Sequence, residues 1–284
     1  KEAASAADYL FLLFFYAVAV GEQGQFQQAI DVLKEGRSLG LKAGERYSTP
    51  KVTNSIGWAY QELCIPDEAL RYNTEALEMV NAMLGPGTSN LFEIESQTRI
   101  NLGENYLERG EIPKALEHLN LVYENSKKPE YFFVRPRWRP RCLLTLAELW
   151  LQERDLDRAQ VYLDEVAADG WTDKFPYRKY QVRAGRLQGN IHAARGRPKE
   201  AEDELTRALE RAKALGNPTQ LWRTHFALGD LYRLQARTND ARTHFHEAWS
   251  VVQGIAEGLT DQELQDRFLQ SAPIQEVFVR GGRT

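Results

Sequence analysis

The sequence predicts an all-α protein built from repeated helical hairpins. The first observation is a series of small residues inside helical sequence, spaced 40 to 46 residues apart: Ala17, Gly57, Gly103, Ala147, Gly189 and Gly229. The second observation is that each small residue is followed by a larger residue three positions later and by an alanine twelve positions later. A period of this length indicates a stack of repeated supersecondary units.

The glycines have a physical reason to recur in this frame. A glycine inside a helix costs about 1 kcal/mol relative to alanine. This cost is tolerable where two helix backbones approach closely, so we expect Gly103 and Gly229 to lie at helix crossings. The aromatic residues of the same frame, Tyr60, Tyr106, Trp150 and Tyr232, are expected to fill the space between the two helices of each hairpin.

The repeat frame divides the chain into a repeat array over residues 1–257 and a C-terminal cap and tail over 258–284. The first turns between helices are predicted at Gly24 and at Ile65–Pro66, where proline suits the first turn of the next helix. Later turns are predicted at Gly110 and Gly196. The predicted hairpins are 10–44, 50–84, 91–128, 137–169, 177–216 and 219–257.

The first helix of the array contains the longest apolar run, twelve residues from Tyr9 to Val20. Because a membrane-spanning helix needs about 20 apolar residues, we expect no membrane partner. A helix that is apolar on all sides is normally buried. This helix is therefore either enclosed by its neighbours or exposes a surface for self-association through residues 9–20.

An arginine-rich stretch, residues 132–144, precedes the fourth hairpin. Pro136 and Pro140 are expected to prevent a helix from running through it. We interpret the stretch as a joint between repeats, with contact to an anion or a partner as a second use. Beyond the last repeat, Leu264, Phe268 and Leu269 share one helix face. They predict a helix that covers the apolar end of the array, since solenoids need such caps.

The frame Leu-Gly-x-x-Tyr followed by spaced alanines resembles the tetratricopeptide repeat, a helix–turn–helix unit. The resemblance covers residues 10–257 and implies a right-handed α-solenoid of about six hairpins with a capping helix. The repeats exceed the usual length of about 34 residues and lack the opening tryptophan. Long repeats of this kind are similar to those of bacterial signalling ATPases, nucleotide cyclases and LuxR-type regulators. We therefore expect a cytoplasmic segment of a larger bacterial signalling or transcription-regulating protein.

Charge and cysteine content limit the classes of partner and the compartment that the sequence suits. The formal net charge of −4 argues against nucleic-acid binding, which usually shows as a basic domain. Residues 1–130 carry a net charge of −7 and residues 131–284 one of +3, so a cationic surface is possible in the later part. The two cysteines, Cys64 and Cys142, are too few for a disulfide framework and suit a reducing compartment.

The sequence contains no motif of catalysis. Phosphate-binding loops, nucleophile elbows and zinc-protease motifs are absent. His244 and His246 lie two residues apart, on different sides of a helix, so they do not chelate one metal ion together. We therefore expect a non-catalytic protein without cofactor or metal.

The resemblance implies that the first helix of each hairpin lines a concave groove that binds a protein or peptide. The family's carboxylate clamp is matched only by Arg186 and Asn190, and Ala227 stands where the next repeat should supply asparagine. Arginines in the later part favour a peptide or small ligand that carries an anionic group. Alternatively, they pair with nearby acidic residues on a solvated surface. The predicted groove residues are Asn54, Trp58, Glu104, Arg141, Glu148, Arg183, Arg186, Asn190, Arg223, Asp230 and Arg233.

Overall fold

The computed structural model describes residues 5–85, 87–169 and 178–282, and over these ranges the chain is all-α without a β-strand, as the sequence predicts. The chain divides into two compact units. The first unit comprises residues 1–142 with 259–261, and the second comprises 143–258 with 262–284. None of the described helices is both long and apolar enough to cross a membrane.

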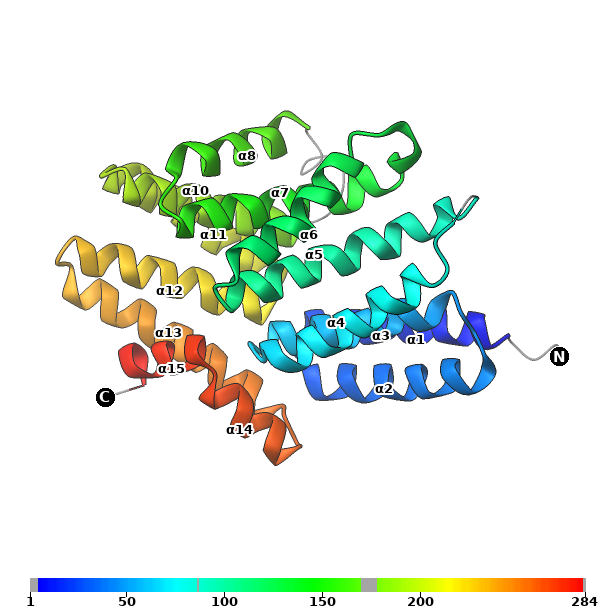
Figure 1. Ribbon diagram of the computed structural model, residues 1–284. Helices are drawn as coiled ribbons and strands as arrows, with labels where there is room; N and C mark the ends of the chain where they lie inside the picture. The colour runs from blue at the N-terminus through cyan, green and yellow to red at the C-terminus, as the bar shows by residue number, and fades with distance from the viewer. Residues whose placement is uncertain (1–4, 86, 170–177, 283–284) are drawn as a thin grey trace. The chain divides into compact units, whose positions relative to one another are not determined.

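The first unit consists of antiparallel helix pairs (Figure 1). It ends within α7 (Val134–Gln152), which runs on into the second unit. Two short 3₁₀ helices, η1 (Ser89–Leu91) and η2 (Pro129–Tyr131), precede α5 and α7. The paired helices are α1 (Ala6–Glu22) and α2 (Phe26–Ala43), α3 (Ser48–Glu62) and α4 (Pro66–Asn81), and α5 (Phe92–Glu108) and α6 (Ile112–Asn125).

The second unit continues with the same kind of pairing. After α8 (Leu156–Ala168) come α10 (Arg178–Ala194) with α11 (Pro198–Leu215) and α12 (Pro218–Leu234) with α13 (Thr238–Glu257). Residue 177, the predicted start of the fifth hairpin, lies outside the described residues. Two short helices follow, α14 (Gln262–Gln270) and α15 (Ala272–Gly281), where the sequence analysis expected one. Pro273 stands in the first turn of α15, a position where proline favours the start of a new helix.

The recurring glycines lie at close helix crossings, as predicted. A Cβ atom added to Gly103 would meet the Leu119 side chain at 2.6 Å, and one added to Gly229 would meet the Phe245 ring at 2.6 Å. Both contacts join the two helices of one hairpin. Gly57 and Gly189 make the same kind of approach to Asn73 and Leu205. The small residue therefore sets the spacing of the helices in each hairpin.

Every described hairpin turn has a left-handed residue seven positions after its small residue. Three of these are the predicted turn glycines, with φ of 87° at Gly24, 72° at Gly110 and 68° at Gly196. The other three, Cys64, Arg154 and Ala236, were not predicted, and their φ angles are 54° to 62°. In each turn the next amide donates to a carbonyl five residues earlier, at 2.8–3.0 Å, as in a Schellman motif.

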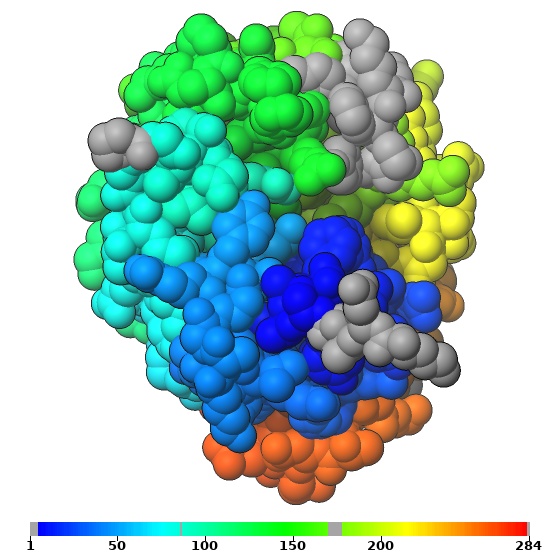
Figure 2. All heavy atoms as spheres, turned by 90° about the vertical axis from the view of Figure 1, so that its right-hand side faces the viewer, coloured from blue at the N-terminus to red at the C-terminus, as the bar shows by residue number. Residues whose placement is uncertain are grey.

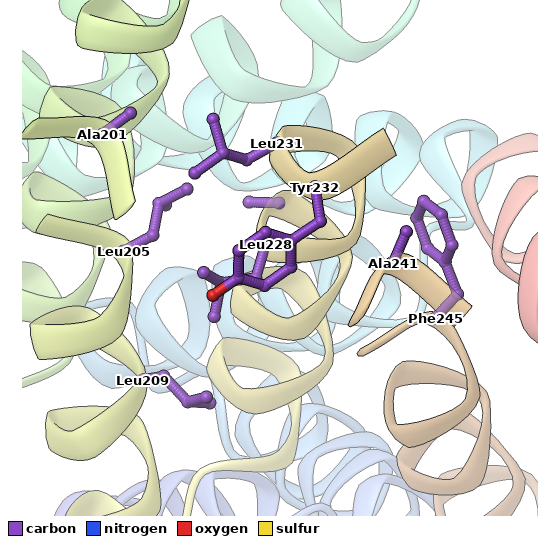
Figure 3. Packing of buried hydrophobic residues seen from close by; sticks show 9 residues of the cluster. Ala201, Leu205, Leu209, Leu228, Leu231, Tyr232, Ala241 and Phe245 are labelled. Carbon is purple, nitrogen blue, oxygen red and sulfur yellow. The ribbon is translucent and has the colours of Figure 1, made fainter. Parts of the chain in front are cut away.

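Aromatic residues fill the space between paired helices. Tyr60 stacks on Tyr72 with ring centroids 5.7 Å apart, and Tyr106 stacks on His118 at 5.6 Å. In the second unit, Tyr232 joins a buried cluster that spans α11, α12 and α13 (Figure 3). Leu205 and Leu209 of α11 pack there against Leu228 and Leu231 of α12. Apolar contacts thus hold α12 to α13 within one hairpin and to α11 of the preceding hairpin.

The expectation that prolines would break residues 132–144 is wrong. Helix α7 begins at Val134 and runs through Pro140 to Gln152. Pro136 lies in the first turn, where amides have no helical acceptor, so its missing N–H costs little. Pro140 lies inside the helix and is followed by Cys142 and Leu143, both fully buried. The burial of this segment outweighs the lost hydrogen bond of one proline.

Candidate functional site

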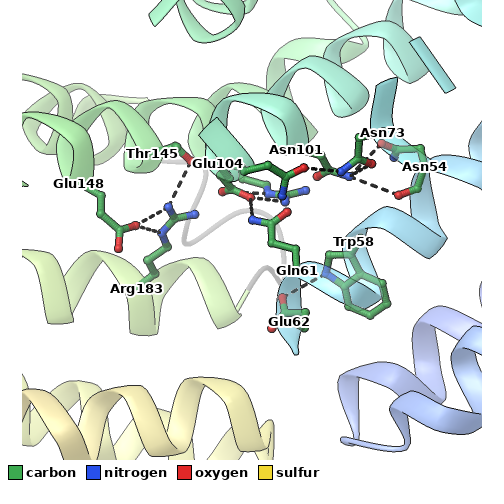
Figure 4. Close-up of polar contacts among 12 residues, drawn as sticks. Asn54, Trp58, Gln61, Glu62, Asn73, Asn101, Glu104, Thr145, Glu148 and Arg183 are labelled. Atoms are coloured by element: carbon green, nitrogen blue, oxygen red, sulfur yellow. Dashed lines mark hydrogen bonds and ion pairs between the residues drawn. The ribbon is translucent and has the colours of Figure 1, made fainter. Parts of the chain in front are cut away.

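The predicted groove residues fall into two groups, one in each unit. In the first unit the structure places Asn54 in the interior rather than at a surface (Figure 4). Its Oδ1 accepts a hydrogen bond from Asn101 Nδ2 at 2.8 Å. Asn73 continues this network by donating to Asn105 Oδ1, also at 2.8 Å. The hydrogen bonds of these four amides connect α3, α4 and α5. Because all four side chains are fully buried, none of them is exposed to a ligand.

Trp58 is also buried, with 6% of its surface exposed. Its indole Nε1 donates to Glu62 Oε1 at 3.1 Å, one turn further along α3. A Cβ atom added to Gly21 would meet the Trp58 ring at 2.8 Å, so the indole packs tightly against α1. This tryptophan therefore has a packing role between the first two hairpins.

Glu104 and Arg141 form a buried ion pair in the first unit. Arg141 Nε donates to Glu104 Oε1 at 3.3 Å, and Gln61 Nε2 donates to Glu104 Oε2 at 2.7 Å. Only 7% of the Glu104 side chain and 10% of the Arg141 side chain are exposed. The pair joins the first helices of two consecutive hairpins. Arg141, in the arginine-rich stretch, is thus engaged within the fold.

In the second unit, Glu148 lies among three arginines. Arg183 Nε and Nη2 donate to Glu148 Oε2 at 3.2 and 2.5 Å, and Arg183 also donates to the Thr145 hydroxyl at 3.2 Å (Figure 4). The Glu148 side chain is 30% exposed. Burial acts to raise the pKa of the Glu148 carboxyl, but Arg183, Arg186 and Arg223 together hold that pKa below its ordinary value. We call Glu148, Arg183, Arg186 and Arg223 the arginine cluster.

Two polar residues of α12 complete the surroundings of this cluster. Arg186 Nη1 donates to Gln220 Oε1 at 3.0 Å and to Thr224 Oγ1 at 3.4 Å. The guanidinium of Arg223 lies 5.3 Å from the Trp222 ring. Gln220 and Thr224 were not among the predicted residues, although their spacing of four residues puts both on one face of a helix. The cluster thus draws on the first helices of three successive hairpins, α7, α10 and α12.

The remaining predicted residues are Asn190 on α10 and Asp230 and Arg233 on α12. Asn190 is half-buried on α10, two turns after Arg183. Asp230 accepts hydrogen bonds from Arg233 Nη2 at 3.2 Å and from Arg280 of α15. The Arg280 guanidinium also lies 4.9 Å from the Phe226 ring. Arg183 and Arg233 therefore pair with nearby acidic residues, which was the alternative to ligand binding. Arg280 was not among the predicted residues.

Two histidines of the second unit meet between α12 and α13. The Nδ1 atoms of His225 and His244 are 3.0 Å apart. Burial, then the neighbouring His244 and Lys213, lower the pKa of His225 to about 4. Across the described ranges, no group of three or more His, Cys, Asp or Glu side chains is placed to hold a metal ion.

Comparison with known proteins agrees with this architecture. Models of the tetratricopeptide repeat match residues 183–251 and 96–120. Together with the structural likenesses below, they show that the chain has a tetratricopeptide-like repeat domain. No curated protein matches the sequence.

Several solved structures have the same fold. The Rap conjugation gene regulator of plasmid pLS20 in complex with the Phr* peptide is 15% identical, with a TM-score of 0.66 over 99% of this chain and 78% of that one. A Rap protein complexed with competence and sporulation factor is 13% identical, with a TM-score of 0.63 over 97% of this chain and 76% of that one. At these identities the likeness shows the fold alone.

A third similar structure belongs to a much longer protein. It is the signal transduction ATPase with numerous domains from Pyrococcus horikoshii, which has a tetratricopeptide repeat sensor. The identity is 13% and the TM-score 0.57, over 91% of this chain and 40% of that one.

Proposed function

We propose that this domain is a non-catalytic regulatory module that binds a protein segment or peptide along the first helices of its hairpins. The observation that carries the proposal is the arginine cluster, in which three guanidinium groups act on the single carboxylate of Glu148. The carboxylate lies on α7, Arg183 and Arg186 lie on α10, and Arg223 lies on α12, so a bound chain would touch three hairpins in succession. One of the similar structures is a complex with the Phr* peptide and another is a complex with competence and sporulation factor, which supports this class of ligand.

The ligand that suits the cluster carries a carboxylate or phosphate group. Arginine forks bind such groups in bidentate fashion, and the Gln220 and Thr224 side chains add polar contacts beside Arg186. An anionic group that approached the cluster would compete with Glu148 for Arg183. A small anionic ligand would meet the same chemistry as an acidic peptide side chain, and the test below separates the two.

We further propose that the module belongs to a larger bacterial signalling or transcription-regulating protein of the cytoplasm. The repeat sensor in the Pyrococcus horikoshii ATPase is an example of such a domain within a longer chain. In that setting, ligand binding to the repeats would change the activity of the parent protein.

Fluorescence anisotropy with labelled acidic and neutral pentapeptides, and with labelled phosphate as a small anion, tests the proposal. We expect acidic peptides to bind and Arg186→Gln with Arg223→Glu to weaken binding at least tenfold, since charge-assisted bonds to both residues are lost. Arg207→Glu is the matched control, because Arg207 is exposed on α11 and pairs with Glu204. Circular dichroism checks that each variant is folded.

The outcomes separate the ligand classes. Binding of acidic peptides but not of phosphate supports a peptide-binding module, and binding of phosphate alone supports a sensor of small anions. Equal binding by the cluster variant and the wild type, or equal loss with Arg207→Glu, would show that the arginine cluster is not the binding site.

A further inference from the structure

Helix α1 exposes an apolar face at the surface of the first unit. Some dark blue atoms from the start of the chain are visible at the surface in Figure 2. Five large apolar residues of α1 are between 40% and 63% exposed: Tyr9, Phe11, Leu12, Phe15 and Tyr16. Isolated exposed apolar residues are common on proteins, but a contiguous patch of this size marks an interaction surface. We call these five residues the α1 face.

The α1 face is a regular helical surface. A capping box fixes the start of the helix, with the Ser5 side chain accepting from the Asp8 amide and the Asp8 side chain accepting from the Ser5 amide. The opposite side of the helix is anchored in the unit by Leu10, Phe14, Ala17 and Gly21, all buried. The two sides together explain the apolar run: one packs inward and the other remains open.

The chemistry of the face suits an apolar partner. No charged residue lies between Asp8 and Glu22. The rings of Phe11 and Phe15 pack edge to face, with centroids 4.6 Å apart. The Tyr16 hydroxyl accepts a hydrogen bond from Gln28 Nε2 at 2.7 Å, so its polar group is satisfied within the chain. One cation lies close by, since Lys51 Nζ of α3 is 5.9 Å from the centroid of the Phe15 ring. An occupant therefore needs mainly apolar surface.

The area of the face fits a second copy of the same chain. Five large side chains, each about half exposed, present roughly 500 Å². A symmetric pair would bury roughly 1,000 Å² in total, which reaches the lower limit of a specific interface. First helices also pack on one another within the chain, α1 on α3, α3 on α5 and α10 on α12, although these pairs run parallel.

We propose that two copies associate through their α1 faces about a two-fold axis, with the helices antiparallel and Phe15 near the axis. In a two-fold interface, each contact occurs twice with exchanged roles. With Phe15 at the axis, Phe11 of one copy lies opposite Ala19 of the second copy, so a large residue meets a small one. This association is separate from ligand binding, because no predicted groove residue lies on α1.

Sedimentation velocity of the full 284-residue chain over a concentration series tests the proposal. We expect a concentration-dependent dimer that persists at high salt, because the contact is apolar. Leu12→Glu and Phe15→Glu should each raise the dimer Kd about 100-fold, the effect of losing a central apolar anchor. Phe133→Glu is the matched control. Phe133 is 71% exposed in the first unit but lies outside the α1 face, and its variant should dimerise like the wild type.

A cross-linking variant keeps the test independent of charge effects on folding. Phe15→Cys should form a disulfide-linked dimer under oxidising conditions, since two residues at a two-fold axis lie close together. A wild type that remains monomeric at the highest concentration overturns the proposal, as does dissociation by Phe133→Glu alone. The acidic-peptide assay on Leu12→Glu is a separate readout: retained peptide binding by a monomer distinguishes a failure here from a failure of the ligand-binding function.

Discussion

The α5–α6 hairpin of the first unit and the α12–α13 hairpin of the second use one frame with different residues. Gly103 and Gly229 occupy the same position, and so do the residues that they contact, Leu119 and Phe245. An acidic residue follows each glycine. Glu104 pairs with Arg141 of the next hairpin, and Asp230 pairs with Arg280 of α15.

This comparison shows what covers the α12–α13 hairpin. Helix α15 supplies to α12 the arginine that α7 supplies to α5. Gly281 of α15 lies directly against the backbone of Phe245 on α13, where a Cβ atom would clash. Helix α15 therefore packs directly on the α12–α13 hairpin, whereas α1 in the first unit leaves its outer face exposed.

The two ion pairs should differ most in how much each contributes to the free energy of unfolding. Glu104→Ala should lower the free energy of unfolding by about 3–5 kcal/mol, because it leaves Arg141 buried without its carboxylate. Asp230→Ala should cost about 1 kcal/mol or less, because its pair with Arg280 is partly exposed. Urea denaturation followed by circular dichroism measures both. Equal losses would contradict the view that the first pair is structural and the second a surface closure.

The next difference concerns acid sensitivity. His225 occupies the position of Arg99 in the earlier hairpin, and its pKa is lowered to about 4 by burial, His244 and Lys213. Below pH 6.5 the unfolded chain binds a proton at this residue that the folded chain does not bind until pH is near 4. Stability is therefore complete above pH 6.5 and falls on acidification, by up to about 1.4 kcal/mol per pH unit.

The measurement is the free energy of unfolding between pH 7 and pH 4, for the wild type and His225→Gln. The variant should lose less stability over this range, because the residue no longer titrates. Parallel pH profiles for the two proteins would show that the His225–His244 contact does not control acid stability.

The smallest expected difference in the free energy of unfolding comes from the left-handed residues of the two turns. Gly110 and Ala236 hold the same left-handed position, with φ of 72° and 58°. An L-residue with a side chain pays a steric penalty in this region that glycine avoids. Ala236→Gly should therefore raise the free energy of unfolding by about 0.5–1 kcal/mol, and Gly110→Ala should lower it by a similar amount. Thermal denaturation of both variants checks the opposite signs.

Much of the fold could be predicted from residue spacing. The small-residue frame located the helix crossings at Gly103 and Gly229, and the aromatic positions located the stacked pairs of Tyr60 and Tyr106. The turn at Ile65–Pro66 was predicted, but the left-handed residues Cys64, Arg154 and Ala236 were missed, because a left-handed position is usually signalled by glycine. The helix through Pro140 was missed because proline is read as a local breaker, and the burial that overrides it is not local.

The candidate site could be predicted only in part. The frame placed Glu104 and Glu148 at equivalent positions, and their partners Arg141 and Arg183 at equivalent positions one hairpin later. The frame did not show that the Glu104–Arg141 pair is buried, with side chains 7% and 10% exposed. Nor did it show that Glu148 is partly exposed to solvent. Asn54 was placed in the groove by the same frame, but the structure buries it against Asn101.

The sequence by itself determined the hairpin, because the residues that set its geometry are close together in the chain. Gly103 and Leu119 are 16 residues apart, and the same spacing recurs at Gly229 and Phe245. Only the tertiary structure decided which polar groups are buried, paired or open. Their partners come from other hairpins, as with Glu104 and Arg141, which are 37 residues apart. The energy of a charge depends on how much water those distant segments exclude, and a local pattern does not carry that information.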